Sequence, residues 1–179
     1  MGGAGTVGSI WTLGAPSGGL RAIWIYRGQA DGCGPAVVGF SSVQIITDQR
    51  SPAFPGERAV VTIGAYDGVH RGHRGVIEHV RRLAAERGCR SAVVTFDRHP
   101  ATVVRPSSAP LLLTGPEEKV ELLKATGVDA LVIVPFDEGQ GAEAPGCFVQ
   151  RVLVDSLGTT GIVVGEAFHF GRHRDGNVD

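Results

Sequence analysis

The stretch that decides the fold reads AVVTIGAYDGVHRGH and occupies residues 59–73. Residues 59–63 are apolar or β-branched and predict a buried strand. Apolar residues then recur at helical spacing over residues 72–87, until Gly88 ends the pattern as glycine does after many helices. The sequence therefore predicts a strand, a tight loop and a helix in direct succession.

Two histidines, His70 and His73, fall where this strand gives way to the helix. In an open α/β sheet that junction faces the ligand crevice, and the helix N-terminus there favours anions. Gly72, between the imidazoles, lets a polyphosphate approach the backbone without meeting a Cβ atom. The arrangement indicates nucleotide handling rather than hydrolysis by a nucleophilic side chain.

The alternation of strand and helix continues to the end of the chain. Further strands are expected at residues 91–96, 130–134 and 161–164, and further helices at residues 116–126 and 147–157. The segments 98–115 and 137–145 are expected to be loops. This order predicts an α/β fold with a Rossmann-like parallel sheet and right-handed crossovers. Loops that follow the strands should gather at their carboxyl ends, namely residues 67–73, 97–100, 135–138 and 165–170.

Composition limits the kinds of partner. The chain has 179 residues, a formal net charge of −1 and 20% charged residues, so no basic face for nucleic acid is predicted. No apolar run approaches the ~20 residues that a membrane span needs, and we expect a cytoplasmic protein. Cys33, Cys89 and Cys147 have no metal-like spacing and are expected to be reduced thiols.

Residues 1–42 differ in composition from the rest of the chain. They are rich in Gly, Ala, Ser and Pro and show no sustained period, so we expect a disordered or dispensable extension. Residues 20–26 have the composition of a short strand, but no evident partner. The domain itself is expected to span residues 43–179.

Three ordered segments carry a family resemblance: GAYDGVHRGH at residues 64–73, TFDRHP at residues 95–100 and GEAFHFG at residues 165–171. The first resembles the HxGH signature of nucleotidyltransferases. Together the segments resemble the FMN adenylyltransferase (FAD synthetase) module of prokaryotic bifunctional riboflavin kinase/FAD synthetases. The resemblance implies a sheet of the HxGH nucleotidyltransferase type.

This resemblance also implies a reaction and its residues. AMP would pass from ATP to FMN, giving FAD and pyrophosphate, with Mg²⁺ held mainly by the ATP phosphates and no metal site of the protein's own. The catalytic residues would be His70 and His73. The nucleotide would be bound by Gly64, Ala65, Tyr66, Asp67, Gly72, Gly165 and Phe168, and the flavin by Phe96, Asp97, His99 and Pro100.

The chain also departs from the family pattern. Ala167 stands where Asn or Asp is usual, and Arg98 stands where proline is usual. The family's later Ser-Ser-Thr-x-x-Arg segment and its riboflavin kinase domain are not found within the 179 residues, so we expect a domain that is incomplete at its C-terminus. The alternative function is a catalytically impaired flavin- or nucleotide-binding relic, or a fragment of a longer bifunctional enzyme.

Single residues leave their own alternatives open. Asp67 is expected either to orient its loop or to hold a water on the metal. Asp97, before His99, is either a flavin contact or a turn former. His70, His73 and His79 together are a conceivable zinc site, although no carboxylate or cysteine stands at a useful spacing.

Overall fold

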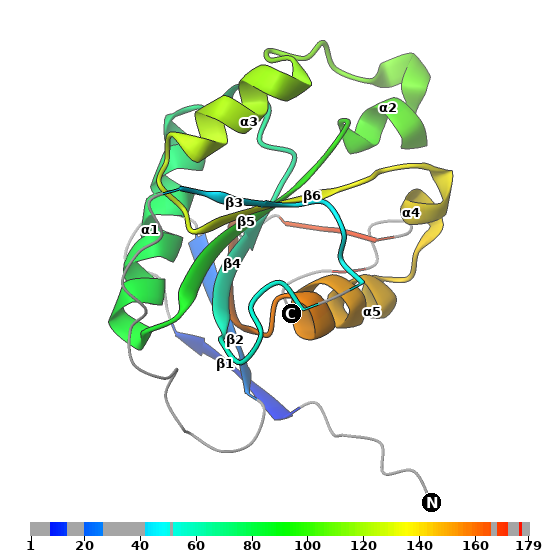
Figure 1. The fold of residues 1–179 in the computed structure, drawn as a ribbon. Coiled ribbons are helices and arrows are strands. Elements are labelled where there is room, and N and C mark those ends of the chain that lie inside the picture. The colour runs from blue at the N-terminus through cyan, green and yellow to red at the C-terminus, as the bar shows by residue number, and fades with distance from the viewer. Residues whose placement is uncertain are drawn as a thin grey trace, which may run out of the picture.

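The computed structural model describes residues 8–13, 20–26, 42–50, 52–165, 168–171 and 176. Its centre is a seven-stranded sheet with the strand order β1-β2-β7-β4-β5-β6-β3 (Figure 1). The strands are β1 (Gly8–Leu13), β2 (Leu20–Tyr26), β3 (Gln44–Ile46), β4 (Ala59–Ile63), β5 (Arg90–Phe96), β6 (Ala130–Val134) and β7 (Thr159–Gly165).

Strands β3 to β7 pair in parallel, and helices connect them. Helix α1 (Arg71–Arg87) links β4 to β5, and α3 (Pro116–Lys124) links β5 to β6. Helix α5 (Pro145–Phe148) continues without a break into the π-helical turn η3 (Val149–Ser156) before β7. Helix α1 and the α5–η3 helix lie on opposite sides of the sheet (Figure 1). The predicted α/β architecture with a parallel sheet is therefore confirmed.

Side chains of the strands alternate between the two helical layers. Ala59, Val61 and Ile63 of β4 share a core with Phe148 and Leu153 of the α5–η3 helix. The intervening residue Val60 packs instead with Val80 and Ala84 of α1, and Val93 and Leu131 of the next strands pack with Ile77 and Leu123. Since successive strand residues point to opposite faces, apolar residues throughout these strands are what a sheet covered on both faces requires.

The direction of the chain across the sheet changes at β4. From β4 it proceeds outward through β5 to β6, and it then returns to β7 on the other side of β4. Ligands of open α/β sheets bind at such a switch point, outside the carboxyl ends of the strands. The loop after β4 lies at this point.

Element bounds agree best where the apolar pattern is continuous. Strands β4 and β6 have the predicted bounds, and α1 and β5 each begin one residue earlier than expected. The expected loop 98–115 contains α2 (Pro100–Val104) and the 3-10 turn η2 (Pro106–Ser108), and the expected loop 137–145 contains α4 (Glu138–Ala142). These helices are at most five residues long, too short to display a 3.6-residue period.

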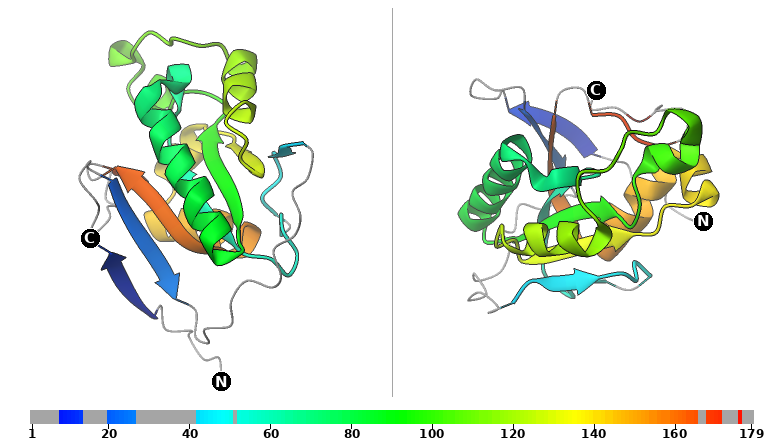
Figure 2. Two further views of the ribbon diagram at one scale, coloured as in Figure 1. Left: turned by 90° about the vertical axis from the view of Figure 1, so that its left-hand side faces the viewer. Right: turned by 90° about the horizontal axis from the view of Figure 1, so that it is seen from above.

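The N-terminal segment contributes two strands to the sheet, which corrects the prediction of a disordered extension for those residues. Strand β2 pairs antiparallel with β7, from Leu20 opposite Gly165 to Trp24 opposite Gly161, and β1 pairs with β2 (Figure 2, left). The β7 partner of β2 lies more than 130 residues away in the chain, so local sequence could not indicate this pairing. The rest of residues 1–41 lies outside the described residues.

The thiol prediction is wrong for one cysteine. Cys89 is disulfide-bonded, whereas Cys147 is a free, exposed cysteine. Cys33 lies outside the described residues. Within the described ranges, no helix has both the length and the apolar character needed to cross a bilayer.

Candidate active site

The loop after β4 has an unusual backbone. Tyr66, Gly68 and Val69 all have positive φ, at 51°, 69° and 36°, around the 3-10 turn η1 (Asp67–Val69). The positive φ of Gly68 favours glycine there, and a Cβ atom would lie 2.9 Å from Leu113 Cδ1, so the Leu113 side chain would have to move. Positive φ in the β-branched, 1% exposed Val69 is strained, and such strain is concentrated at functional sites.

Tyr66 anchors this loop to the strand that precedes it. Its ring is buried, and its hydroxyl lies 2.7 Å from the Thr62 hydroxyl oxygen. Burial raises the pKa of Tyr66 well above its usual value, although the Thr62 hydrogen bond opposes this effect. Tyr66 is therefore a neutral, structural residue of the loop after β4, and its ring centroid lies 4.9 Å from that of His73.

Asp67 ties the loop to the segment before α3. Its carboxylate accepts hydrogen bonds from the backbone N–H groups of Leu113 (2.8 Å) and Thr114 (3.0 Å) and from the Thr114 hydroxyl (2.9 Å). Burial raises the pKa of Asp67, but these hydrogen bonds and the charge of His99 outweigh it and leave the pKa below its ordinary value. The contacts favour the loop-orienting alternative for Asp67.

His70 and His73 stack at the N-terminus of α1. Their ring centroids are 3.6 Å apart, and the ring planes are inclined by 21°. His70 is the N-cap residue, and its Nδ1 accepts from the His73 backbone N–H at 3.4 Å. Because Nδ1 accepts, neutral His70 carries its proton on Nε2 and can donate from there to an oxyanion. A Cβ atom on Gly72 would lie 3.2 Å from the His70 ring, so glycine also leaves room for the stack.

His73 is the more enclosed of the two histidines. Its Nδ1 is buried and has no hydrogen-bond partner among the described residues. Burial lowers the pKa of His73, the neighbouring His70 lowers it further, and Asp67 partly opposes both effects. Burial of the ring and the charge of His70 therefore both favour the neutral form of His73.

The predicted flavin-side residues follow β5. Asp97 accepts from the backbone N–H groups of Phe136 (2.8 Å) and Arg98 (2.8 Å), so it joins the ends of β5 and β6. His99 caps α2, and its Nδ1 accepts from Ala101 N at 3.1 Å. Pro100 opens α2, and the Phe96 ring meets that of Phe136 edge to face at 5.1 Å. The hydrogen bonds of Asp97 thus link two strand ends, and its contact with a flavin stays a prediction.

Lys119 is a charged residue of the site that was not predicted. It is 9% exposed, and its Nζ donates to the Phe96 carbonyl oxygen at 2.6 Å. Burial lowers the pKa of Lys119, whereas Asp67 and Asp97 raise it. In the sequence Lys119 follows two glutamates in the first turn of α3, which is a pattern typical of a solvated helix face. Only the folded structure shows that its side chain reaches the end of β5.

Residues of the two predicted subsites meet around one small surface pocket. It is lined by Ala65, Asp67, Asp97, Arg98, His99, Leu112, Thr114, Pro116 and Lys119. Gly64 lies at the start of the same loop, and its N–H donates to Val94 O at 3.0 Å. The structure therefore brings residues predicted for the nucleotide and residues predicted for the flavin together at the carboxyl ends of β4 and β5.

Gly165 and Phe168 lie at the carboxyl end of β7. The Phe168 N–H donates to Gly165 O at 3.0 Å, and the Phe168 ring stacks on Phe170 at 5.6 Å. Phe168 packs against the core on the α5 face, so its ring has a structural role in addition to any ligand contact. Ala167, the main departure from the family pattern, lies outside the described residues.

The zinc alternative has no support in the described part of the chain. His79 Nδ1 accepts from Arg82 Nη2 at 2.8 Å on the surface of α1. No group of three or more His, Cys, Asp or Glu side chains suited to a metal ion occurs among the described residues.

Comparisons with known proteins identify the family of this chain. Residues 55–179 match the sequence model of the family described as FAD synthetase. The chain is 38% identical over 120 residues to a bifunctional riboflavin kinase/FMN adenylyltransferase of Pseudomonas fluorescens, with 67% of this chain and 38% of the relative covered. The Escherichia coli K12 protein of the same name is 35% identical over 123 residues, with 69% and 39% covered.

A solved structure shares the fold. A crystal structure titled as a macrolide-efflux protein from Streptococcus pneumoniae matches with a TM-score of 0.61 and 24% identity, over 74% of this chain and 44% of that one. The chain spans less than two-fifths of the length of the two curated relatives. From the family match over most of its length, the chain belongs to the FAD synthetase family.

Proposed function

We propose that this chain is an FMN adenylyltransferase, which transfers AMP from ATP to FMN and releases pyrophosphate. The observation that carries the proposal is the stacked pair of His70 and His73 at the N-terminus of α1, next to the switch point of the sheet. A phosphate oxygen of FMN attacks the α-phosphorus of ATP, and the bond from that phosphorus to the pyrophosphate oxygen breaks. Such a displacement needs positioning and charge stabilisation more than covalent chemistry.

The histidines supply donors for the charge that develops. His70 is exposed at the helix start, and its Nε2–H and the first N–H groups of α1 are donors that favour phosphoryl oxygens. His73 has a lowered pKa and is neutral when the site is empty; an adjacent phosphate dianion favours its protonated form and strengthens its hydrogen bond. The strained loop of residues 64–69 holds these donors in place against the buried Tyr66.

Mg²⁺ is proposed as the metal, bound mainly by the ATP phosphates. The carboxylates present fit that arrangement, because Asp67 and Asp97 already accept backbone N–H groups and have few lone pairs left. Mg²⁺ keeps several waters and needs few protein ligands. When bound, it would neutralise charge on the triphosphate and on the departing pyrophosphate.

The flavin would bind beside the nucleotide, next to Phe96, Asp97, His99 and Pro100. The pocket shared by Ala65, Asp67, Asp97 and His99 supports this neighbourhood. We place the family domain at residues 43–179, with β1 and β2 of the preceding segment added to the edge of its sheet. The small substrates and the net charge of −1 support a cytoplasmic enzyme that does not use nucleic acid. The alternative is a relic that binds flavin or nucleotide without turnover. Ala167 favours this alternative, because its methyl group cannot make the hydrogen bond, worth ~0.5–1.5 kcal/mol, of the Asn or Asp side chain that is usual there.

One experiment separates the enzyme from the relic. The purified chain is incubated with ATP, FMN and Mg²⁺, FAD formation is followed by chromatography, and binding of each substrate is measured by calorimetry. FAD formed by the native chain and reduced at least about 100-fold in His73→Ala supports the transferase. Substrate binding without FAD above the His73→Ala level identifies the relic, and neither binding nor turnover refutes both functions.

A further inference from the structure

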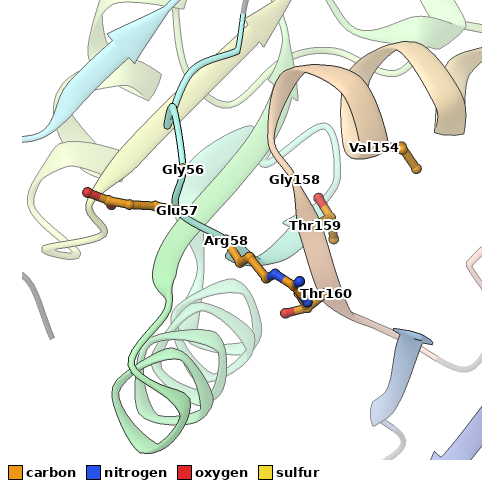
Figure 3. Close-up of a pocket in the computed structure, with 7 residues that line it drawn as sticks. All are labelled: Gly56, Glu57, Arg58, Val154, Gly158, Thr159 and Thr160. Atoms are coloured by element: carbon orange, nitrogen blue, oxygen red, sulfur yellow. The ribbon is translucent and has the colours of Figure 1, made fainter. Parts of the chain in front are cut away.

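A pocket lies at the opposite end of the sheet from the histidines, where β4 and β7 begin (Figure 3). Its volume is about 270 Å³. It is lined by Gly56, Glu57, Arg58, Val154, Gly158, Thr159 and Thr160. Since β4 and β7 are parallel, their first residues meet at the edge remote from the loops of the candidate active site. The pocket is therefore a separate feature of the molecule.

Arg58 brings an uncompensated positive charge to this pocket. Its neighbour Glu57 is engaged elsewhere, because its carboxylate forms an ion pair and two hydrogen bonds with Arg90. In Figure 3 the side chains of Glu57 and Arg58 extend in opposite directions from the adjacent backbone. Within the described ranges, the partly buried Arg58 side chain makes no ion pair or hydrogen bond. A guanidinium in this setting favours an anionic partner with two acceptor oxygens.

Thr159 supplies an unpartnered hydroxyl. The residue is 6% exposed, and in the described part of the chain its Oγ1 has no hydrogen-bond partner. A buried hydroxyl without a partner is costly, and a bound acceptor would remove that cost.

The backbone of β7 is irregular at the same place. Ala59 pairs with Thr159, whereas Val60 pairs with Gly161, so Thr160 is an extra residue in the ladder. Bulges of this kind redirect side chains and are frequent beside functional sites. The Thr160 hydroxyl already donates weakly to Ala59 O at 3.4 Å, which leaves Thr159 as the buried hydroxyl without a partner.

We propose that this pocket binds an oxyanion group, a phosphate or a carboxylate, between the Arg58 guanidinium and the Thr159 hydroxyl. The guanidinium donates two N–H groups to the anion, and the hydroxyl donates a third hydrogen bond. The charge of Glu57 does not oppose the anion, since Arg90 neutralises it. The site is independent of the proposed transferase activity.

The test uses the full chain labelled with ¹⁵N, in a His73→Ala background that weakens phosphate binding at the active site. Inorganic phosphate and acetate are titrated separately at constant ionic strength, and amide shifts of Gly158, Thr159 and Thr160 are followed. We expect saturable shifts of these amides with at least one anion, and the tighter anion identifies the group. Shifts confined to the loop after β4, or no saturable shifts, would overturn the site.

Two substitutions and a control locate the binding. Arg58→Gln should weaken anion binding about ten-fold or more, because it removes the charge and the fork of donors. Thr159→Val keeps the shape of the side chain and should weaken binding about three-fold or more, without loss of stability, because the hydroxyl has no protein partner. Arg50→Gln removes a surface arginine, 92% exposed and paired with Asp48, and should leave binding unchanged. Equal affinity in the native chain and Arg58→Gln would refute the assignment.

Discussion

Asp67 holds the loop after β4 through hydrogen bonds that only an acceptor can receive. In Asp67→Asn one oxygen becomes an NH₂ group that faces the N–H donors of Leu113 and Thr114. We expect the free energy of unfolding to fall by ~1–3 kcal/mol, measured by urea unfolding at neutral pH. The control Glu78→Gln breaks the surface pair with Arg81 and should cost ~0–1 kcal/mol.

The cost should depend on pH in a defined direction. Because the pKa of Asp67 lies below its ordinary value of 3.8, the carboxylate's stabilising contribution is present above that value and is lost as pH falls through the lowered pKa. The difference between Asp67→Asn and the native chain should shrink over that window. If Asp67→Asn and Glu78→Gln lowered the free energy of unfolding equally at neutral pH, the hydrogen bonds of Asp67 to Leu113 and Thr114 would not stabilise the fold.

The buried pair of Tyr66 and Thr62 can be tested by a double-mutant cycle. Tyr66→Phe leaves the Thr62 hydroxyl buried without its partner, and we expect a loss of ~1–2 kcal/mol in urea unfolding. Thr62→Val should cost a similar amount for the converse reason. The double variant has neither polar group, so its loss should be clearly smaller than the sum. Additive losses would show that the two hydroxyls do not interact.

His73 should make stability depend on pH near neutrality. Its pKa in the folded chain lies below the unfolded value of 6.5, so the unfolded state binds more protons between the two values. The free energy of unfolding should therefore fall as pH decreases through 6.5, and His73→Asn should lack this component. Urea unfolding of both chains from about pH 8 to pH 5 measures the difference. Parallel curves would show that His73 does not titrate in this way.

The sequence predicted which residues lie near the strand ends better than it predicted how their side chains are arranged. The positions of His70, His73, Asp67 and Asp97 at strand ends followed from the apolar pattern alone, because parallel strands all end at one edge. The apolar pattern did not predict the stacking of the His70 and His73 rings or the hydrogen bond from the Leu113 N–H to Asp67. They depend on contacts across more than forty residues or on side-chain rotamers, which no local pattern contains.

At the scale of elements, α1 offers a pair of glycines with opposite predicted effects. Gly88 ends the helix at φ 63°, and its N–H donates to the carbonyls of Ala84 and Ala85. Gly88→Ala should cost ~1–2 kcal/mol, because alanine is disfavoured in the left-handed region. Gly75 lies within the helix, and a Cβ atom there would meet nothing within 4 Å. Gly75→Ala should therefore stabilise by ~0.5–1 kcal/mol.

Urea unfolding of both glycine variants gives the sign of each effect directly. A loss of stability in Gly75→Ala, or none in Gly88→Ala, would contradict the helix bounds of Arg71–Arg87. The two substitutions add the same methyl group, one within α1 and one at its C-cap. Opposite changes in the free energy of unfolding would therefore reflect backbone conformation and not composition.

The strength of each element's signal explains which elements the sequence could reveal. Strands β4 and β6 are continuous apolar runs bounded by glycine, charge or proline, and α1 has several turns of apolar spacing. Helix α4 reads EGQGA, with two glycines, and it is held by the Asp137 side chain, which accepts from Gln140 N at 2.8 Å. A cap residue and tertiary packing, not helix propensity, make such a segment helical.

At the scale of the whole molecule, the sheet combines a parallel part with an antiparallel edge. The sequence predicts four of the five parallel strands but not β3, and it does not predict the pairing of the antiparallel edge. The five parallel strands place the histidine loop at the switch point and leave the amino ends of β4 and β7 for the Arg58 pocket. The edge of β7 beyond this unit is covered by β2, which runs beside it for five paired residues (Figure 2, left). Strands β1 and β2 are thus coupled to the rest of the sheet through the backbone of β7.

This coupling predicts what happens when the N-terminal segment is removed. Deletion of residues 1–42 leaves the backbone groups of the β7 edge without partners, and we expect a loss on the order of 1–3 kcal/mol from several hydrogen bonds worth ~0.5–1.5 kcal/mol each. Urea unfolding measures the loss, and hydrogen exchange should show faster exchange at the β7 amides. Ala22→Pro, which keeps the chain length but removes one N–H from β2 between its two neighbours, should act in the same direction. A dispensable, unpaired arm would instead leave both the stability and the exchange of β7 unchanged in either variant, so the two measurements decide between a structural edge and a tail.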